Sequence, residues 1–405
     1  LDNVNHNAYI SGYGNGMFKP DAGITRAETV EIFYKLLLDK ERESAEYPDV
    51  DLGLWYAKSI GTISKMGIVK GYENGKFEPN KKITRAEFTK IAVSFSSIDM
   101  ASSNFKDVPS DEWFYPYIST ASSRGWINGY KDGTFLTNKE ITRAEAVSIV
   151  NRMLDRYPPA DINTKKDVKN FFDFLHAYWA YGQIEEASTN HKYTIDLAAK
   201  TEVWTDYEKD TTPVTSKWVY DGNNKYYVHS STKKFVRGNH FIDGQAYYFD
   251  QDTALPYNGF RYVEKYKRYY IGGIVQDDLT KLNVVSGPYY IKVYKPSNYV
   301  VVFAKDGDKG YTIPVKAMIA SCGNNTPVGS YSSPNKFRWL RMVGGSWAQW
   351  CTQIRGDYLF HSVPNAVKTN TSLYVNAYNN LGTTQSLGCI RLTCEDAKWV
   401  YDNCK

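Results

Sequence analysis

Ile24-Thr25-Arg26-Ala27-Glu28 is one of three near-identical stretches in the first third of the chain. The other two copies are Ile83-Thr84-Arg85-Ala86-Glu87 and Ile141-Thr142-Arg143-Ala144-Glu145, and each copy follows a Gly-Tyr-x-x-Gly-x-Phe segment, at 12–18, 71–77 and 129–135. A period of about 58 residues indicates a repeat array. Threonine three residues before glutamate is a capping box, so each stretch predicts the start of a helix. The glycine-rich segment before it predicts a turn.

These repeats resemble S-layer homology modules over residues 1–157. The resemblance implies an α-helical array with pseudo-threefold symmetry that binds an anionic, often pyruvylated, secondary cell-wall polysaccharide. Arg26, Arg85 and Arg143 occupy the family's ligand-binding position, and a guanidinium can bind a carboxylate with two hydrogen bonds. The alternative is that each arginine pairs with a neighbouring acid. The first repeat lacks the Asp-Val…Trp helix that precedes the other two turns, so we expect its binding groove to be impaired.

A second stretch, Ser386-Leu387-Gly388-Cys389-Ile390-Arg391-Leu392, carries candidate chemistry near the C-terminus. A thiolate is a strong nucleophile, and a nearby imidazole can take its proton. His361 arrives from the separate segment Tyr358-Leu359-Phe360-His361-Ser362. Gly388 permits a tight turn and a close approach of substrate. We therefore expect Cys389 to act as nucleophile and His361 as base.

Four segments in order resemble the catalytic domain of bacterial L,D-transpeptidases; they span 326–331, 360–364, 386–391 and 397–402. The resemblance implies a mainly-β domain over residues 285–405 that acts on peptidoglycan stem peptides through an acyl-enzyme on Cys389. Ser386 is expected to orient the catalytic pair or to shape the turn. Arg391 is expected either to fix a substrate carboxylate or to form a buried ion pair.

One residue departs from the family pattern, because Leu387 stands where a histidine is usual. If that histidine mainly shapes the site, activity survives the change; if it activates the thiol, activity is weakened or lost. Three functions therefore stay open. They are a wall-anchored transpeptidase, an L,D-carboxypeptidase in which water resolves the thioester, and a non-catalytic wall-binding protein with a degenerate domain.

The middle of the chain is less informative. Residues 158–212 are expected to form a helical spacer, since apolar residues over 165–186 recur at helical intervals. Residues 213–284 carry paired tyrosines every 21 or 22 residues, at 226–227, 247–248 and 269–270. This spacing predicts stacked β-hairpins, and the segment is loosely similar to aromatic cell-wall-binding repeats. The tyrosines could contact glycan or only form a core.

The two resemblances imply a location outside the cell, and composition and motifs add no cofactor. The 405 residues carry a net charge of +5, which suits anionic wall polymers and does not argue for nucleic acid. No apolar run is long enough to span a membrane, and no P-loop, dinucleotide fingerprint or zinc-spaced cluster appears, so no cofactor or metal is expected. Cys322, Cys351, Cys394 and Cys404 could be bridged or free. Both ends look truncated, and we expect a cell-wall location in a Gram-positive-type bacterium.

Overall fold

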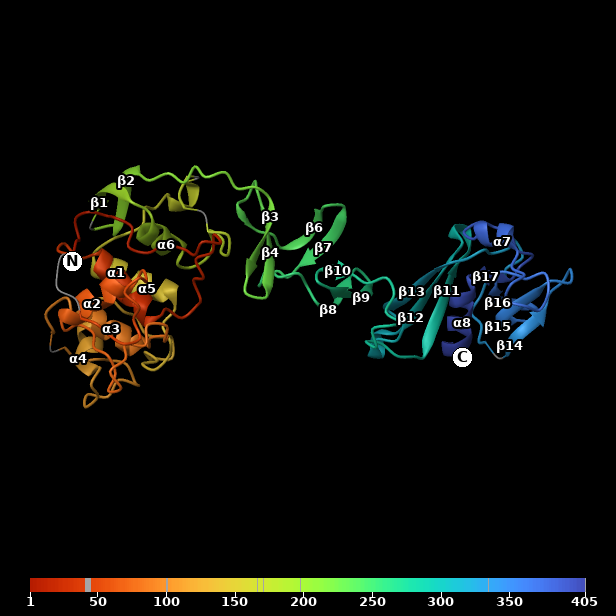
Figure 1. The fold of residues 1–405 in the computed structure, drawn as a ribbon, viewed down its shortest axis with the longest axis horizontal. Helices are drawn as coiled ribbons and strands as arrows, with labels where there is room; N and C mark the ends of the chain where they lie inside the picture. The colour runs from red at the N-terminus through yellow and green to blue at the C-terminus, as the bar shows by residue number, and fades with distance from the viewer. Residues whose placement is uncertain are drawn as a thin grey trace. The chain divides into compact units, whose positions relative to one another are not determined.

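This computed structural model describes residues 1–40, 45–99, 101–165, 167–169, 171–196, 198–333 and 335–404 (Figure 1). Two compact units divide the chain, Leu1–Val236 and Arg237–Lys405. The multidomain organisation predicted from the sequence is confirmed. The boundary between the units falls inside the aromatic repeat expected over residues 213–284, so the hairpins of that repeat are shared between the units.

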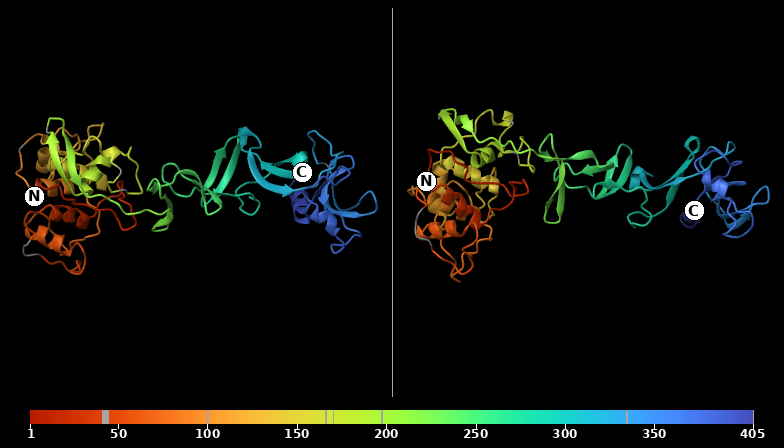
Figure 2. Two further views of the ribbon diagram at one scale, coloured as in Figure 1. Left: turned by 90° about the horizontal axis from the view of Figure 1, so that it is seen from above. Right: turned by 45° about the horizontal axis from the view of Figure 1, so that its top comes forward.

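The N-terminal unit is built on short helices. They are α1 (Arg26–Lys35), α2 (Ala57–Lys65), α3 (Arg85–Val93), α4 (Tyr115–Ser123), α5 (Arg143–Met153) and α6 (Tyr181–Ser188), with a 3₁₀ turn at Ile162–Thr164. The predicted capping boxes start α1, α3 and α5, because Thr25, Thr84 and Thr142 each accept a hydrogen bond from the backbone of the glutamate three residues on. The hairpin of β1 (His191–Asp196) and β2 (Thr201–Tyr207) follows α6 (Figure 2).

The three repeats close on one another through their isoleucines. Ile24 N–H donates to the Ile141 carbonyl, Ile83 N–H to the Ile24 carbonyl and Ile141 N–H to the Ile83 carbonyl, at 3.0, 3.1 and 3.1 Å. All three side chains are fully buried. This cyclic set of hydrogen bonds is the pseudo-threefold arrangement that the sequence predicts.

The segment that the first repeat lacks at its N-terminal side is supplied by residues that follow the third repeat in the chain. Asp173 accepts hydrogen bonds from the N–H groups of Phe18 and Lys19, at 3.0 and 2.6 Å. In the other two repeats the equivalent acceptors are Asp49, on Phe77 and Glu78, and Asp107, on Phe135 and Leu136. A tryptophan follows each aspartate by six residues, and α2, α4 or α6 comes next. The expectation of an incomplete first repeat is therefore wrong.

Aromatic packing explains why the described residues between 165 and 180 do not form the predicted helix. Phe171 lies against Gly12, where an added Cβ would be 2.4 Å from its ring, just as Tyr47 and Phe105 lie against the glycines of the other two turns. Phe172 lies in the same way against Gly16. The aromatic spacing serves this packing and not a helix face. Among the described residues of the expected spacer, α6 is the one α-helix, and Ile162–Thr164 is a 3₁₀ turn.

The predicted aromatic hairpins are present. They pair β3 (Lys217–Asp221) with β4 (Asn224–His229), β6 (Gly238–Ile242) with β7 (Gln245–Phe249), and β8 (Gly259–Val263) with β9 (Tyr266–Ile271); β5 (Lys234–Phe235) and β10 (Ile274–Val275) extend the first and third. Tyr248, Tyr257 and Tyr270 pack edge to face or tilted at 5.7–6.0 Å between ring centroids. Tyr248 and Tyr270 are buried, whereas Tyr257 and the remaining paired tyrosines are half-buried.

The C-terminal unit is mainly β, as predicted. One antiparallel sheet consists of β11 (Tyr289–Tyr294), β12 (Tyr299–Ala304) and β13 (Ile313–Ile319). The other has the order β14 (Lys336–Arg341), β15 (Trp347–Arg355), β16 (Tyr358–Ser362) and β17 (Ile390–Leu392). The short helix α7 (Val375–Asn379) precedes β17, and α8 (Cys394–Asn403) buries Ala397 and Val400 in the core formed with β12 and β13.

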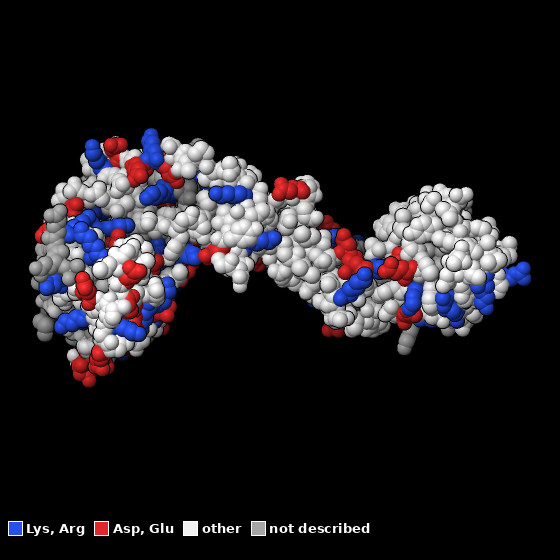
Figure 3. All heavy atoms as spheres, in the orientation of Figure 1, with Lys and Arg blue, Asp and Glu red and all other residues white. Residues whose placement is uncertain are grey.

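The distribution of surface charge and the length of the helices bear on the expectations from composition. Lys and Arg are interspersed with Asp and Glu over the visible face of the N-terminal unit (Figure 3). Within the described residues, no helix is both long and apolar enough to cross a membrane.

Candidate functional site

Parallel pairing of β16 with β17 brings the predicted catalytic residues together. His361 lies opposite Arg391 in the register of these strands. Cys389 immediately precedes β17, and alternation along an extended chain places it on the same face as Arg391. Cys389 packs against Leu359, which alternates to the same face as His361. The three predicted residues Cys389, His361 and Arg391 therefore share one face.

The nucleophile turn has little freedom. Gly388 has φ +151° and lies so close to Tyr358 that an added Cβ would be 2.4 Å from the ring. Ser386 Oγ donates to the Cys389 carbonyl at 2.5 Å and accepts from Gly388 N–H at 3.1 Å. Thr326 Oγ1 donates to the Gly388 carbonyl at 2.8 Å. Ser386 and Thr326 therefore hold the backbone of the turn, and the hydrogen bonds of the described residues include none from either side chain to the thiol.

His361 is neutral at physiological pH. Its ring is 1 % exposed, and burial lowers its pKa to about 4, with the positive charge of Arg391 acting in the same direction. Nδ1 lies 2.6 Å from the Ser362 carbonyl, which requires a proton on Nδ1. The lone pair is then on Nε2, so this nitrogen is the available base.

Cys389 is held as a protonated thiol. Burial raises its pKa above the usual 9.0, although the Leu359 N–H and the Arg391 charge oppose this rise. Sγ donates to the Asp357 carbonyl at 3.5 Å. The described hydrogen bonds include none between Sγ and His361. The resting pair is thus a neutral thiol and a neutral imidazole, and reaction requires the proton to leave as the carbonyl is attacked.

Arg391 has a free hydrogen-bonding group. Its Nε is buried and has no hydrogen-bond partner, and no acidic side chain lies within ion-pair distance of it among the described residues. The expected alternative of a buried ion pair is therefore not found there. Since Nε is buried, a substrate carboxylate could reach it only if neighbouring atoms move.

Three further features concern this domain. Leu387, two residues before Cys389, is 76 % exposed. All five cysteines are free thiols, so none of the disulfide bridges that the sequence left open is formed. A cavity of about 600 Å³ is lined in part by Phe360 and Ile390. These residues alternate with His361 and Cys389, so the cavity lies on the opposite face of the strands from the thiol.

The three repeat arginines are buried and hold neighbouring repeats together. The Nε groups of Arg26, Arg85 and Arg143 donate to the carbonyls of Phe77, Phe135 and Phe18, at 2.8–2.9 Å. Arg85 also pairs with Glu145 at 3.1 Å and Arg143 with Glu28 at 3.0 Å. Arg85 and Arg143 therefore form the ion pairs with neighbouring acids that were the alternative to ligand binding.

A groove nevertheless opens beside Arg85. It has a volume of about 180 Å³, and its lining includes Tyr130, Glu145, Arg152 and Trp179. Trp179 comes from the downstream segment that completes the first repeat, and it is 61 % exposed. Arg152 and Trp179 were not predicted as site residues. The six-residue spacing from aspartate to tryptophan is the signal that could have identified Trp179.

Comparison with known families matches both ends of the chain. Residues 3–30, 46–89 and 104–147 match the S-layer homology domain, and residues 288–405 match the L,D-transpeptidase catalytic domain. The chain carries S-layer homology repeats and an L,D-transpeptidase domain. Surface-layer and cell-surface relatives of the repeats place it at the cell surface or in the cell wall.

Two relatives come from Acetivibrio thermocellus. Cell surface glycoprotein 1 is 36% identical over 208 residues, covering 47% of this chain and 9% of its own length. The cellulosome-anchoring protein is 36% identical over 203 residues, covering 47% of this chain and 44% of its own. The chain thus spans less than half of either relative. A solved L,D-transpeptidase from Mycobacterium smegmatis is 21% identical, with a TM-score of 0.21 and coverage of 27% and 50%.

Proposed function

We propose that the protein is a wall-anchored L,D-transpeptidase that forms an acyl-enzyme on Cys389. The supporting observation is the shared face of Cys389, His361 and Arg391 inside a domain that matches this catalytic family. The substrate class is a peptidoglycan stem peptide with a terminal D-residue.

The chemistry follows from the two neutral groups. Sγ attacks the carbonyl that joins the third residue of the stem to its terminal D-alanine, and His361 Nε2 takes the thiol proton as the C–S bond forms. The imidazolium then gives that proton to the leaving amine as the C–N bond breaks. The Cys389 N–H is our candidate donor to the oxyanion, since the Gly388 N–H already bonds Ser386. An amine of another stem then attacks the thioester carbonyl and gives a proton to His361. The C–S bond breaks as the C–N bond forms, and the imidazolium returns the proton to Sγ.

A mass-spectrometric assay tests this proposal. The full chain is incubated with a disaccharide-tetrapeptide, and the expected result is an acyl adduct on the peptide that contains Cys389, followed by cross-linked dimer. Cys389→Ala should lose both, while Cys394→Ala, which removes the exposed thiol on α8, should keep both. Turnover that persists in Cys389→Ala would disprove the mechanism. Tripeptide without dimer would indicate an L,D-carboxypeptidase.

A non-catalytic wall-binding protein is the second candidate. It is favoured by Leu387 at the position of the family histidine and by a thiol that bonds the Asp357 carbonyl. The absence of any adduct in a folded wild-type protein would support it.

For the anchor, we propose that the groove of Arg85, Arg152 and Trp179 binds an anionic wall polysaccharide, with pyruvylated sugars as one possible ligand. Trp179 offers an exposed aromatic face to a sugar ring, and Arg152 offers a positive charge beside it. Arg26, Arg85 and Arg143 remain proposed ligand contacts, although their buried guanidinium groups also join the repeats. Substituting them would therefore mix binding with stability.

Binding of the full chain to purified walls tests the anchor. Arg152→Ala should weaken binding at least about tenfold, because a hydrogen bond to a charged group contributes about 1.5–3 kcal/mol. Trp179→Ala should weaken it as well. Trp218→Ala, in the aromatic hairpins, is the control and should bind normally. Loss of binding only in Trp218→Ala would assign wall contact to the hairpins.

A further inference from the structure

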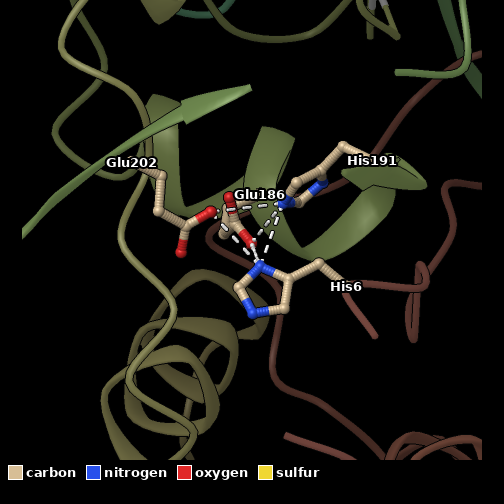
Figure 4. Close-up of side chains that lie close together, drawn as sticks. All are labelled: His6, Glu186, His191 and Glu202. Carbon is tan, nitrogen blue, oxygen red and sulfur yellow. Dashed lines mark hydrogen bonds and ion pairs between the residues drawn. The ribbon is translucent and has the colours of Figure 1, made fainter. Parts of the chain in front are cut away.

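Two histidines and two glutamates meet in the interior of the N-terminal unit (Figure 4). His6 comes from the N-terminal segment, Glu186 from α6, His191 from the start of β1 and Glu202 from β2. Their exposed fractions are 2, 0, 8 and 1 %. Sequence analysis missed this cluster because its members are up to 196 residues apart and follow no metal-binding spacing.

Five of the six distances between the four facing atoms are close to the edge of a tetrahedral zinc site, and all six are within 4.8 Å. His6 Nδ1 lies 3.3 Å from Glu186 Oε1, 3.2 Å from Glu202 Oε2 and 3.1 Å from His191 Nε2. His191 Nε2 lies 3.1 Å from Glu186 Oε1 and 3.4 Å from Glu202 Oε2. Ligands at the usual zinc distances of about 2.0–2.1 Å in a tetrahedral site are separated by about 3.3 Å.

Protons alone cannot account for these contacts. Each of the two facing nitrogens has three polar neighbours but can carry only one hydrogen atom. Glu186 Oε1 and Glu202 Oε2 are buried and have no hydrogen-bond partner. Two carboxylates buried this close together are costly unless a positive charge lies between them. A divalent cation at the centre would satisfy all four atoms and neutralise both charges.

Outer hydrogen bonds orient three of the four ligands. His191 Nδ1 lies 2.9 Å from the Thr189 carbonyl, so the proton belongs on Nδ1 and the lone pair of Nε2 faces the centre. The outer oxygen of Glu186 accepts from Trp204 Nε1 at 3.2 Å, and that of Glu202 accepts from the Tyr157 N–H at 2.8 Å. Such outer hydrogen bonds are typical of metal sites in proteins.

We infer that His6, Glu186, His191 and Glu202 form a structural site for Zn²⁺. Two imidazole nitrogens and two carboxylate oxygens suit zinc, and four protein ligands without solvent access leave no open position for catalysis. The ion joins the N-terminal segment to α6 and to the β1–β2 hairpin. It thereby fixes the downstream segment that completes the first repeat.

Zinc content of the full chain tests the inference. The protein is stripped with a chelator, loaded with zinc sulfate, freed of excess metal and analysed by elemental mass spectrometry. Wild type should hold one zinc ion per chain, whereas Glu202→Gln should hold almost none. Glu185→Gln is the matched control, because Glu185 is equally buried beside Glu186 but lies outside the cluster. A folded wild type without zinc, or full zinc content in Glu202→Gln, would overturn the inference.

Two further measurements cover a variant that fails to fold. Trp204→Phe keeps the ring but removes the donor to Glu186, so its zinc affinity should fall about 10–100-fold in competition with a chelating dye. Cobalt substituted into wild type should give the visible bands of a four-coordinate site without sulfur-to-metal charge transfer. Unchanged affinity in Trp204→Phe, or a sulfur band that indicates cysteine ligation, would contradict the assignment.

Discussion

Asp173→Ala should destabilise the turn of the first repeat locally and leave the turns of the other two repeats unchanged. The carboxylate of Asp173 accepts the N–H groups of Phe18 and Lys19. Hydrogen bonds to charged groups contribute about 1.5–3 kcal/mol each, which would suggest a loss of about 3–6 kcal/mol. Two effects reduce this sum. Burial raises the pKa of Asp173, so ionised Asp173 carries a desolvation cost that alanine lacks. In addition, the backbone N–H of half-buried Lys19 can form a hydrogen bond to water when the carboxylate is removed.

We therefore expect a local loss of about 2 kcal/mol, because the N–H of fully buried Phe18 is left without a partner. This corresponds to about thirtyfold faster amide exchange over residues 12–18. Hydrogen-exchange mass spectrometry on the full chain measures it, with residues 71–77 of the second repeat as the internal reference. Asp49→Ala should show the reverse pattern.

Asp161→Ala is the control, since Asp161 is exposed and its side chain pairs with Lys165. It should leave exchange at residues 12–18 unchanged. If Asp173→Ala also leaves exchange over 12–18 unchanged, the downstream segment does not complete the first repeat, and the reasoning fails.

Three predictions concern the catalytic domain. The pKa of His361 is lowered to about 4, so the rate of acylation by tetrapeptide should fall on the acid side only near pH 4. The pKa of Cys389 is raised above 9.0, so its rate of alkylation by iodoacetamide should still rise above pH 9. An acid limb of acylation near pH 6.5 would contradict this. Gly388→Ala forces a Cβ against Tyr358 at φ +151°. Strain of about 1–3 kcal/mol should slow acylation at least about fivefold in a stopped assay. Wild-type rates would show that the turn is adaptable. Leu387→His changes an exposed position, so the free energy of unfolding from thermal denaturation should change by less than about 0.5 kcal/mol. The rate of acylation should increase. Slower acylation would mean that leucine is adapted to the site.

Local patterns were enough to predict much of the fold. The capping boxes at Thr25, Thr84 and Thr142 set the helix starts, and the paired tyrosines marked the hairpins, since both signals depend on neighbours in the chain. The nucleophile turn and the histidine strand were equally visible, because their chemistry needs particular residue types.

Long-range contacts were not predictable in the same way. Residues 165–180 carry apolar residues at helical intervals, but Phe171 and Phe172 pack against Gly12 and Gly16 of the first turn. Tertiary packing here overrides the local pattern. Likewise, nothing near His6 in sequence indicates that it faces Glu186, His191 and Glu202. The state of the thiol also depends on burial, which the motif does not reveal.

The divided first repeat makes the N-terminal unit a circular permutation of three whole repeats. The segment that leads into α6 lies after the third repeat in the chain, but its Asp173 accepts hydrogen bonds from Phe18 and Lys19 of the first turn. Ala187 of α6 itself accepts from the N–H groups of Tyr9 and Ile10. A fragment that stops at residue 157 would therefore omit a third of one repeat. A rearranged gene that places residues 171–190 ahead of residue 8 should preserve the same contacts with a new order of the chain, because permutation keeps a fold wherever the joined ends can meet.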